Sequence, residues 1–158
     1  MKRLPSKPFL LCLILTDMRI VVVLICLFSL TAYKKPVKGI SVEVTGLRNN
    51  NGYVLISLFK ESNGFPDQAE KAVRKARLGI SNRKAAVVFS DIQPGQYAIS
   101  ILHDENSDQK MNTNGLGIPK EGYGFSNNVT GAFGPPSFKR ASFKYNGDLV
   151  SLTIRTRY

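Results

Sequence analysis

Apolar and polar residues alternate through much of the chain after residue 39, and this period of two is typical of β-strands with one buried face. Ile40, Val42 and Val44 alternate with polar residues, so the first strand is expected to bury one side. Residues 53–59 are apolar on both faces, which predicts a strand inside a sheet. Further strands are predicted over residues 77–81, 85–89, 96–103, 138–145 and 149–156.

Turn sequences separate these strands. Residues 50–52 (Asn-Asn-Gly) follow the first strand, and Pro94-Gly95 supplies the fixed φ and the positive φ of a type II turn. Asn146-Gly147 predicts a tight antiparallel hairpin, so the last two strands are expected to be neighbours. We therefore predict an all-β fold, an antiparallel two-sheet sandwich of about seven strands, immunoglobulin-like or transthyretin-like. Residues 89–97 resemble the turn and tyrosine-bearing strand of transthyretin-like and carboxypeptidase-regulatory-like sandwiches.

One segment departs from the period of two. Within residues 66–77, Ala69, Ala72, Val73 and Ala76 stand at helical spacing, with acidic residues first and basic residues last. We predict one short helix that crosses between strands. The alternative is a basic helix that lies on a membrane surface.

The N-terminal part of the chain has the organisation of a secretory leader. Read from Met18, Arg19 is a short positive head, residues 20–30 are an apolar stretch, and Ala32 is a small residue for cleavage. We predict a signal peptide over residues 1–32, with Met18 as an alternative start.

A membrane anchor over about residues 9–32 is the alternative, but Asp17 and Arg19 would each cost about 2.5–3.5 kcal/mol inside a bilayer. After cleavage, a linker over residues 33–38 and one sandwich domain over residues 39–158 remain, without a stable membrane span. The protein is therefore expected in the periplasm or outside the cell.

Removal of the leader changes both the cysteine content and the charge. Cys12 and Cys26 lie within it, so the mature domain would have neither a disulfide nor a thiolate metal ligand. The leader carries four basic residues and one acidic residue, so the formal net charge falls from +11 to +8. The remaining Lys and Arg are scattered without interleaved aromatic residues, so nucleic acid is not an expected partner. A solvated surface and an anionic envelope or extracellular partner remain as alternatives.

Oxygen-bearing side chains accumulate after the strand that ends at residue 103. Asp104, Asn106, Asp108 and Asn112 fall at positions 1, 3, 5 and 9 of a calcium-binding loop, and the carbonyl of Lys110 would take position 7. Calcium is the one cofactor that this spacing indicates, since magnesium demands stricter octahedral geometry.

Two positions depart from the calcium pattern. Gln109 stands where Gly is usual, and Gly115 stands where a bidentate Glu would close the coordination shell. Glu121 takes the place of that Glu only if the loop folds back. The alternative is a purely structural turn, in which Asp and Asn side chains accept hydrogen bonds from their own backbone.

The connection over residues 115–136 has no repeating period, and its aromatic residues indicate an ordered loop that binds a ligand. His103 is the only histidine, which leaves zinc without enough nitrogen ligands. The candidate ligand-binding residues are His103, Glu105, Glu121, Tyr123 and Phe125.

These residues favour an exported, non-enzymatic binding or accessory module, and no catalytic residue is assigned. The alternative is a hydrolase of envelope or extracellular polymers that uses Asp104, Glu105 and Glu121 as acid and base. Paired carboxylates cleave glycosidic bonds at separations of about 5–9.5 Å.

The chain carries the run YAISILHDENSDQKMNTNGLGIPKEGYGFSNN, which continues to GAFGPPSFKRASF. With its His-Asp-Glu-Asn and Gly-Ile-Pro-Lys-Glu-Gly-Tyr-Gly-Phe-Ser motifs, this run resembles the secreted bacterial family catalogued as domain of unknown function 2141. The resemblance covers about residues 40–158 and implies an exported β-sandwich. It implies no activity and no catalytic residue.

Overall fold

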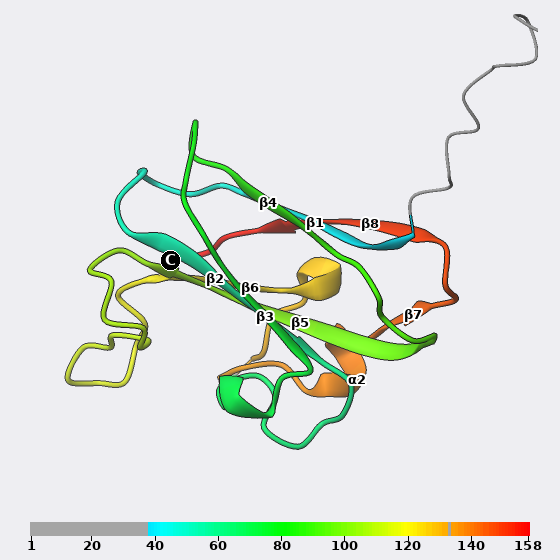
Figure 1. Cartoon of the computed structure of the whole chain (residues 1–158). Helices are drawn as coiled ribbons and strands as arrows, with labels where there is room; N and C mark the ends of the chain where they lie inside the picture. The colour runs from blue at the N-terminus through cyan, green and yellow to red at the C-terminus, as the bar shows by residue number, and fades with distance from the viewer. Residues whose placement is uncertain (1–37, 133) are drawn as a thin grey trace, which may run out of the picture. The chain divides into compact units, whose positions relative to one another are not determined.

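In the described part of the chain, eight strands form two sheets that pack face to face (Figure 1). The computed structural model describes residues 38–132 and 134–158, which belong to one compact unit. The strands are β1 (Gly39–Thr45), β2 (Tyr53–Phe59), β3 (Arg74–Leu78), β4 (Ala85–Phe89), β5 (Gly95–Asp104), β6 (Gly122–Phe125), β7 (Phe143–Tyr145) and β8 (Leu149–Arg155). Between them lie two 3-10 turns and one short helix: η1 (Ala69–Lys71), η2 (Ser126–Asn128) and α2 (Phe138–Ala141). The predicted all-β two-sheet fold is confirmed.

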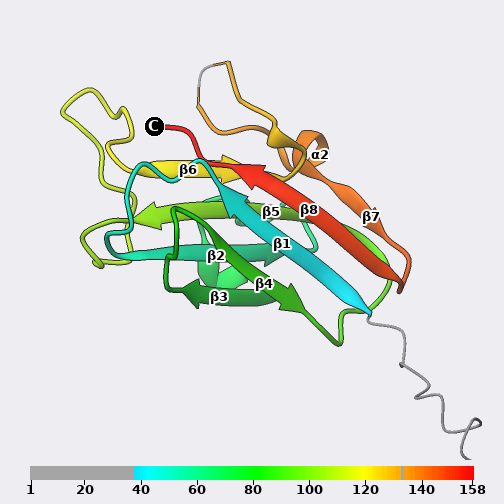
Figure 2. The same cartoon turned by 90° about the horizontal axis from the view of Figure 1, so that it is seen from above.

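The two sheets differ in size. The smaller has the order β4-β1-β8 and the larger the order β3-β2-β5-β6, with β7 also paired to β5 (Figure 2). The strand over residues 53–59 lies between β3 and β5, as its two apolar faces predict. All strand pairs are antiparallel except β1 with β8, which is parallel and departs from the purely antiparallel sandwich of the prediction.

Apolar side chains fill the space between the sheets. The fully buried members come from β1, β2, β5 and β8 and include Ile40, Val42, Val44, Val54, Leu58, Ile99 and Ile154. A second, smaller cluster lies on the other face of the larger sheet, where Phe65 contacts Phe59, Phe125 and Phe138. Burial on both faces of β2 and β5 holds the larger sheet rigid, and the strand ends that support the candidate site belong to this sheet.

The prediction of a helix over residues 66–77 is wrong. Only η1 is helical there, and Arg74–Leu78 forms the edge strand β3, which pairs with β2. The helical face consisted of three alanines and one valine, which bury little apolar area. Pairing with the open edge of β2 satisfies backbone groups that a short exposed helix would leave to water. The strand expected over residues 77–81 therefore begins three residues earlier than predicted, at Arg74, and ends at Leu78.

The prediction of a hairpin at Asn146-Gly147 is also wrong. The segment preceding it pairs with β5 in the larger sheet, and the segment following it pairs with β1 in the smaller one. The turn therefore connects the two sheets, and Gly147 adopts a φ of 102° there. The strand predicted over residues 138–145 is shorter than expected, because its first half is α2.

A further strand, β6, lies inside the connection expected to be without regular structure. Its sequence Gly-Tyr-Gly-Phe has too few alternating apolar residues to show the period of two.

The predicted signal peptide over residues 1–32 and nearly all of the linker over residues 33–38 lie outside the described residues. Among those described, no helix has both the length and the apolar character needed to cross a membrane.

Candidate functional site

The acidic loop, residues 104–121, connects the end of β5 to the start of β6. The antiparallel register of these strands pairs His103 with Gly122. The next residues outward, Asp104 and Glu121, therefore face each other at the base of the loop. This register brings Glu121 back toward the acidic turn. From the sequence, Glu121 could replace the closing Glu of a calcium loop only if the loop folded back in this way.

Two buried carboxylates organise the backbone of the acidic loop. Asp104 is 0% exposed, and its Oδ1 and Oδ2 accept the backbone N–H groups of Asp108 (3.1 Å) and Gln109 (3.0 Å). Glu121 is 5% exposed, and its Oε1 and Oε2 accept those of Glu105 (3.0 Å) and Asn112 (3.0 Å). Backbone hydrogen bonds thus compensate the burial of both carboxylates.

Asp108 lies at the exposed side of the same turn. Its Oδ2 accepts hydrogen bonds from the side-chain amides of Asn106 (2.9 Å) and Asn112 (3.0 Å), and its Oδ1 accepts the backbone N–H of Lys110 (2.9 Å). The Asn112 amide, the Asn106 amide and this backbone N–H lower the pKa of the Asp108 carboxyl below its ordinary value. The carboxylate is therefore held in its charged form.

The predicted metal-ligating side chains lie together. One carboxylate oxygen from each of Asp104, Asp108 and Glu121 lies within 4.8 Å of the other two. Asn106 and Asn112 join the same cluster through Asp108. Lys110, whose carbonyl is the predicted ligand, contributes its backbone N–H to Asp108 Oδ1.

The backbone at Gln109 explains how a turn without glycine coils in this way. Gln109 adopts a φ of 63°, the left-handed conformation for which calcium loops normally use Gly. Ser107 has a φ of 66°. The left-handed region costs a residue with a Cβ roughly 1–2 kcal/mol, which the hydrogen bonds to Asp104 offset.

The arrangement has unused capacity for a cation. Each carboxylate oxygen of Asp104 and Glu121 accepts one hydrogen bond within the described part of the chain, although a carboxylate oxygen has two lone pairs. The oxygens of the three carboxylates and the Oδ1 atoms of Asn106 and Asn112 are hard donor atoms. Such a set suits Ca²⁺, which takes six to eight oxygen ligands at about 2.3–2.6 Å.

His103 is fully buried beside the loop. Its Nε2 lies 2.9 Å from the Asn51 carbonyl oxygen, which can only accept, so Nε2 carries the hydrogen. Its Nδ1 lies 2.6 Å from the Tyr158 hydroxyl, which also accepts the backbone N–H of Arg48 (2.9 Å). Both ring nitrogens are therefore satisfied inside the protein.

Glu105 points away from the three-carboxylate cluster. Its Oε1 lies 2.7 Å from Nη2 of Arg48, and its Oε2 accepts a hydrogen bond from the Asn49 amide (2.8 Å). Burial raises the pKa of the Glu105 carboxyl, but the hydrogen bonds from Asn49 and Arg48 and the Arg48 charge outweigh this effect and lower it. Arg48 also stacks over the Tyr158 ring, 4.5 Å from its centroid. Arg48, Asn49 and Tyr158 lie far from Glu105 in sequence, and no local pattern marks them.

The two predicted aromatic binding residues have packing roles. Phe125 is 7% exposed and its ring lies 6.0 Å from that of Phe65, within the smaller hydrophobic cluster. Tyr123 is half-buried and contacts Phe125. Both side chains anchor β6 and so fix the position of Glu121.

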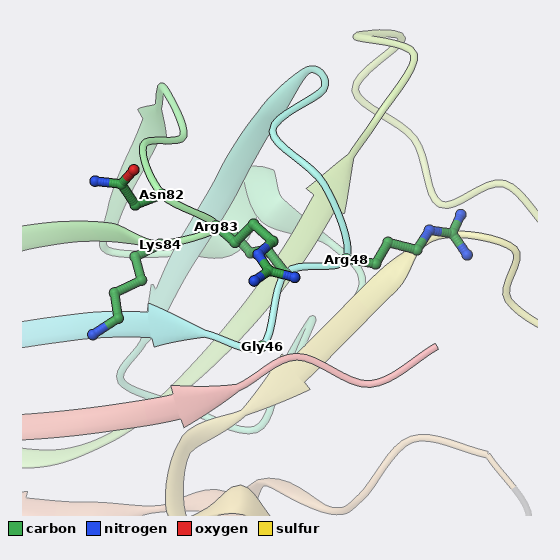
Figure 3. Close-up of a pocket in the computed structure, with 6 residues that line it drawn as sticks. Gly46, Arg48, Asn82, Arg83 and Lys84 are labelled. Carbon is green, nitrogen blue, oxygen red and sulfur yellow. The ribbon is translucent and has the colours of Figure 1, made fainter.

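A hollow of about 390 Å³ lies between the segment that follows β1 and the turn that precedes β4 (Figure 3). It is lined by Gly46, Leu47, Arg48, Asn82, Arg83 and Lys84. Figure 3 shows the Arg48 and Lys84 side chains pointing away from each other. None of the candidate residues predicted from the sequence lines this hollow.

Comparison with known proteins gives one match. The model of a family described as an uncharacterized protein conserved in bacteria, the domain of unknown function 2141, matches residues 42–153. No curated protein and no solved structure matches the chain. The match covers both sheets from β1 into β8, includes the whole acidic loop, and agrees with the resemblance seen in the sequence. The chain is a member of the bacterial family of domain of unknown function 2141.

Proposed function

We propose that the chain is an exported, non-catalytic binding or accessory module whose acidic loop binds a calcium ion. One observation carries the calcium part: the carboxylates of Asp104, Asp108 and Glu121 have oxygens within 4.8 Å of one another at the end of a rigid sheet. Export is inferred from the apolar leader over residues 1–32.

Calcium fits this cluster better than other biological cations do. The loop offers carboxylate and amide oxygens, and the described side chains of the cluster include neither sulfur nor imidazole. Three negative charges in a small volume repel one another, and a divalent cation removes this repulsion. Binding would require Asn106 and Asn112 to turn Oδ1 toward the ion in place of the Nδ2 groups that contact Asp108 now.

A binding role also agrees with the state of the buried carboxylates. Asp104 and Glu121 hold the backbone of the loop through four N–H groups, so both carboxylates have a fixed place in the fold. An ion at this place would order the loop surface that a partner contacts.

Calorimetric titration of the full chain with CaCl₂ tests the proposal. We expect saturable binding, a melting temperature that rises with calcium concentration, and slower proteolytic cleavage of the acidic loop. Asp108→Asn should weaken binding about tenfold or more while the protein stays folded, because Asp108 is exposed. Asp148→Asn is the matched control, since it removes the same charge from an exposed turn before β8.

The calcium proposal is overturned if millimolar calcium changes neither the melting temperature nor the cleavage rate. It is also overturned if Asp108→Asn and Asp148→Asn bind calcium as the unchanged chain does.

A further inference from the structure

One side of the sandwich is closed by hydrogen bonds, and the opposite side is open. On the closed side, Asn128 Oδ1 accepts the N–H of Arg155 (2.8 Å) and its Nδ2 donates to the Thr153 carbonyl (2.9 Å), which covers the edge of β8. β3 and β4 lie along the other side (Figure 2), and no described strand pairs with their outer edges. Such an edge presents backbone donors and acceptors to which a further strand can bind.

The backbone groups of Lys75 and Arg77 point away from the larger sheet. Val73 donates its N–H to the Leu58 carbonyl (2.8 Å), so the backbone groups of Leu58 point toward β3. Directions alternate along an antiparallel pair, so Arg74, the partner of Leu58, points toward β2 and the next residue points away from it. Lys75 and Arg77 therefore each present an N–H and a C=O at the outer edge, where no described strand pairs with them.

The open side is strongly basic. Residues 71–90 contain six basic and no acidic side chains, and Glu70 and Asp91 are the nearest acidic residues in sequence. Of the six basic residues, Lys84 forms an ion pair with Glu43 (3.0 Å), and the other five form none within the described part of the chain. Cations on an edge strand disfavour pairing with a basic strand and favour pairing with an acidic one.

The two faces of β3 define the side chains of a matching strand. Lys75 and Arg77 are exposed on one face, whereas Ala76 and Leu78 are half-buried on the other face and pack against the core. A strand added to this edge would place alternate side chains beside the two cations and the intervening ones beside Ala76 and Leu78. Carboxylates that alternate with apolar residues fit this pattern.

Two occupants from the chain itself meet like charges at this edge. The β3 strand of a second copy would bring its own Lys75 and Arg77 against the same two cations. Residues 33–38, which precede β1, contain three lysines. Like charges on paired strands are destabilising, so an acidic strand from a different protein fits better.

We propose that the outer edge of β3 binds an extended acidic segment of another protein, which adds to the sheet as a strand with its carboxylates beside Lys75 and Arg77. The inference adds a second site to the proposed binding role and does not depend on calcium.

A fluorescein-labelled peptide in which Glu alternates with Val tests the proposal. Its fluorescence anisotropy is measured with the full chain in EDTA, so that calcium does not contribute. We expect saturable binding that weakens as salt rises, and no binding of the same peptide with Lys in place of Glu.

N-methylated peptides distinguish strand addition from simple charge attraction. One form is methylated at the Glu residues and the other at the Val residues, so both keep every carboxylate. The form that loses the N–H groups facing β3 should bind about tenfold or more weakly than the unmodified peptide.

Charge reversal on β3 tests the location of the site. Lys75→Glu/Arg77→Glu should weaken binding of the Glu-Val peptide about tenfold or more. Lys139→Glu/Lys144→Glu is the matched control, since it changes the net charge equally at exposed positions of α2 and β7. All variants keep the apolar leader, so its contribution is the same in each.

The proposal is overturned if the Glu-Val peptide shows no saturable binding, if both N-methylated forms bind as the unmodified peptide does, or if the two double variants bind equally. Self-association in sedimentation velocity that Lys75→Glu/Arg77→Glu abolishes would also overturn it, because a second copy would then occupy the edge. Calcium titration is read separately, so peptide binding in EDTA and calcium binding can each fail alone.

Discussion

The buried hydroxyl group of Ser126 pairs with a backbone group of β5 at a place where neither β6 nor β7 pairs with that strand. Along β5, pairing with β7 ends at Tyr97 and pairing with β6 begins at Ser100. The N–H of Ile99 lies between these pairs and donates to Ser126 Oγ (2.9 Å), whose hydroxyl donates to the Ala141 carbonyl (2.6 Å). Ser126 is 0% exposed, so water cannot replace it.

Ser126→Ala should therefore lower the free energy of unfolding by about 1–3 kcal/mol, because two buried backbone groups lose their partner. Urea unfolding measures the change. Ser151→Ala, on an exposed position of β8, is the control and should change stability by less than about 0.5 kcal/mol. Equal effects of the two substitutions would contradict the assigned role of Ser126.

Tyr97 fixes the turn before β5. Its hydroxyl donates to the carbonyl of Gln93 four residues earlier (2.7 Å), the arrangement of a tyrosine corner. Burial and then the neighbouring Tyr145 raise the pKa of Tyr97, against an opposing effect of Arg74. The folded state therefore binds this proton more tightly than the unfolded state does.

Because the folded pKa is raised, the contribution of Tyr97 is complete below the ordinary tyrosine pKa of about 10 and is lost as pH rises above it. We expect the unfolding free energy to fall in this alkaline range, and Tyr97→Phe to fall less steeply. Urea unfolding at neutral and alkaline pH measures the two slopes. Identical slopes would mean that Tyr97 does not titrate in the way its burial requires.

At the scale of elements, β6 depends on close approach to the C-terminal segment. A Cβ on Gly122 would lie 2.5 Å from Thr156 Cγ2 and 2.7 Å from the Tyr158 ring. Tyr158 in turn covers the buried His103.

Gly122→Ala should consequently displace Tyr158 and destabilise the protein by about 1–3 kcal/mol, measured as a lower melting temperature. Gly115→Ala is the matched control, since nothing lies within 4 Å of its Cβ. Equal melting temperatures of Gly122→Ala and Gly115→Ala would show that β6 and Tyr158 do not pack closely.

The strands that follow the period of two were predictable within a few residues, and the other elements were not. β1, β2, β4, β5 and β8 carry alternating or continuous apolar residues that bury one or both faces. β3 has a largely exposed surface, so its sequence does not distinguish an edge strand from a short helix. Its conformation is decided by the open edge of β2, which is distant in sequence.

In the acidic loop, too, residues with a local sequence pattern were predictable, and those placed by distant strands were not. Local spacing identified Asp104, Asn106, Asp108 and Asn112, which lie together. The participation of Glu121 depended on the register of β5 with β6, and β6 itself had no detectable period. The partners of Glu105 come from the segment after β1, so only the packed fold reveals them.

At the scale of the whole molecule, a rigid sheet supports one projecting polar loop. The core of fully buried residues lies between the sheets, whereas residues 106–111 of the loop are all exposed. Local opening of the loop should therefore cost much less free energy than opening of the strands.

Hydrogen exchange on the full chain measures this difference. Amides of β2 and β5 should exchange slowest, and those of residues 105–112 fastest. Calcium should slow exchange at Asp108, Gln109 and Asn112, whose N–H groups bond to the two buried carboxylates, and leave the strands unchanged. Uniform slowing of all amides would indicate a general salt effect in place of a bound ion.

We propose that the three carboxylates of the acidic loop hold a cation, and a crystal structure of the protein grown with calcium tests this proposal. The expected result is one ion with anomalous signal, at about 2.3–2.6 Å from oxygens of Asp104, Asp108 and Glu121. A structure at millimolar calcium without an ion there, in which these carboxylates contact only amide N–H groups, would contradict it.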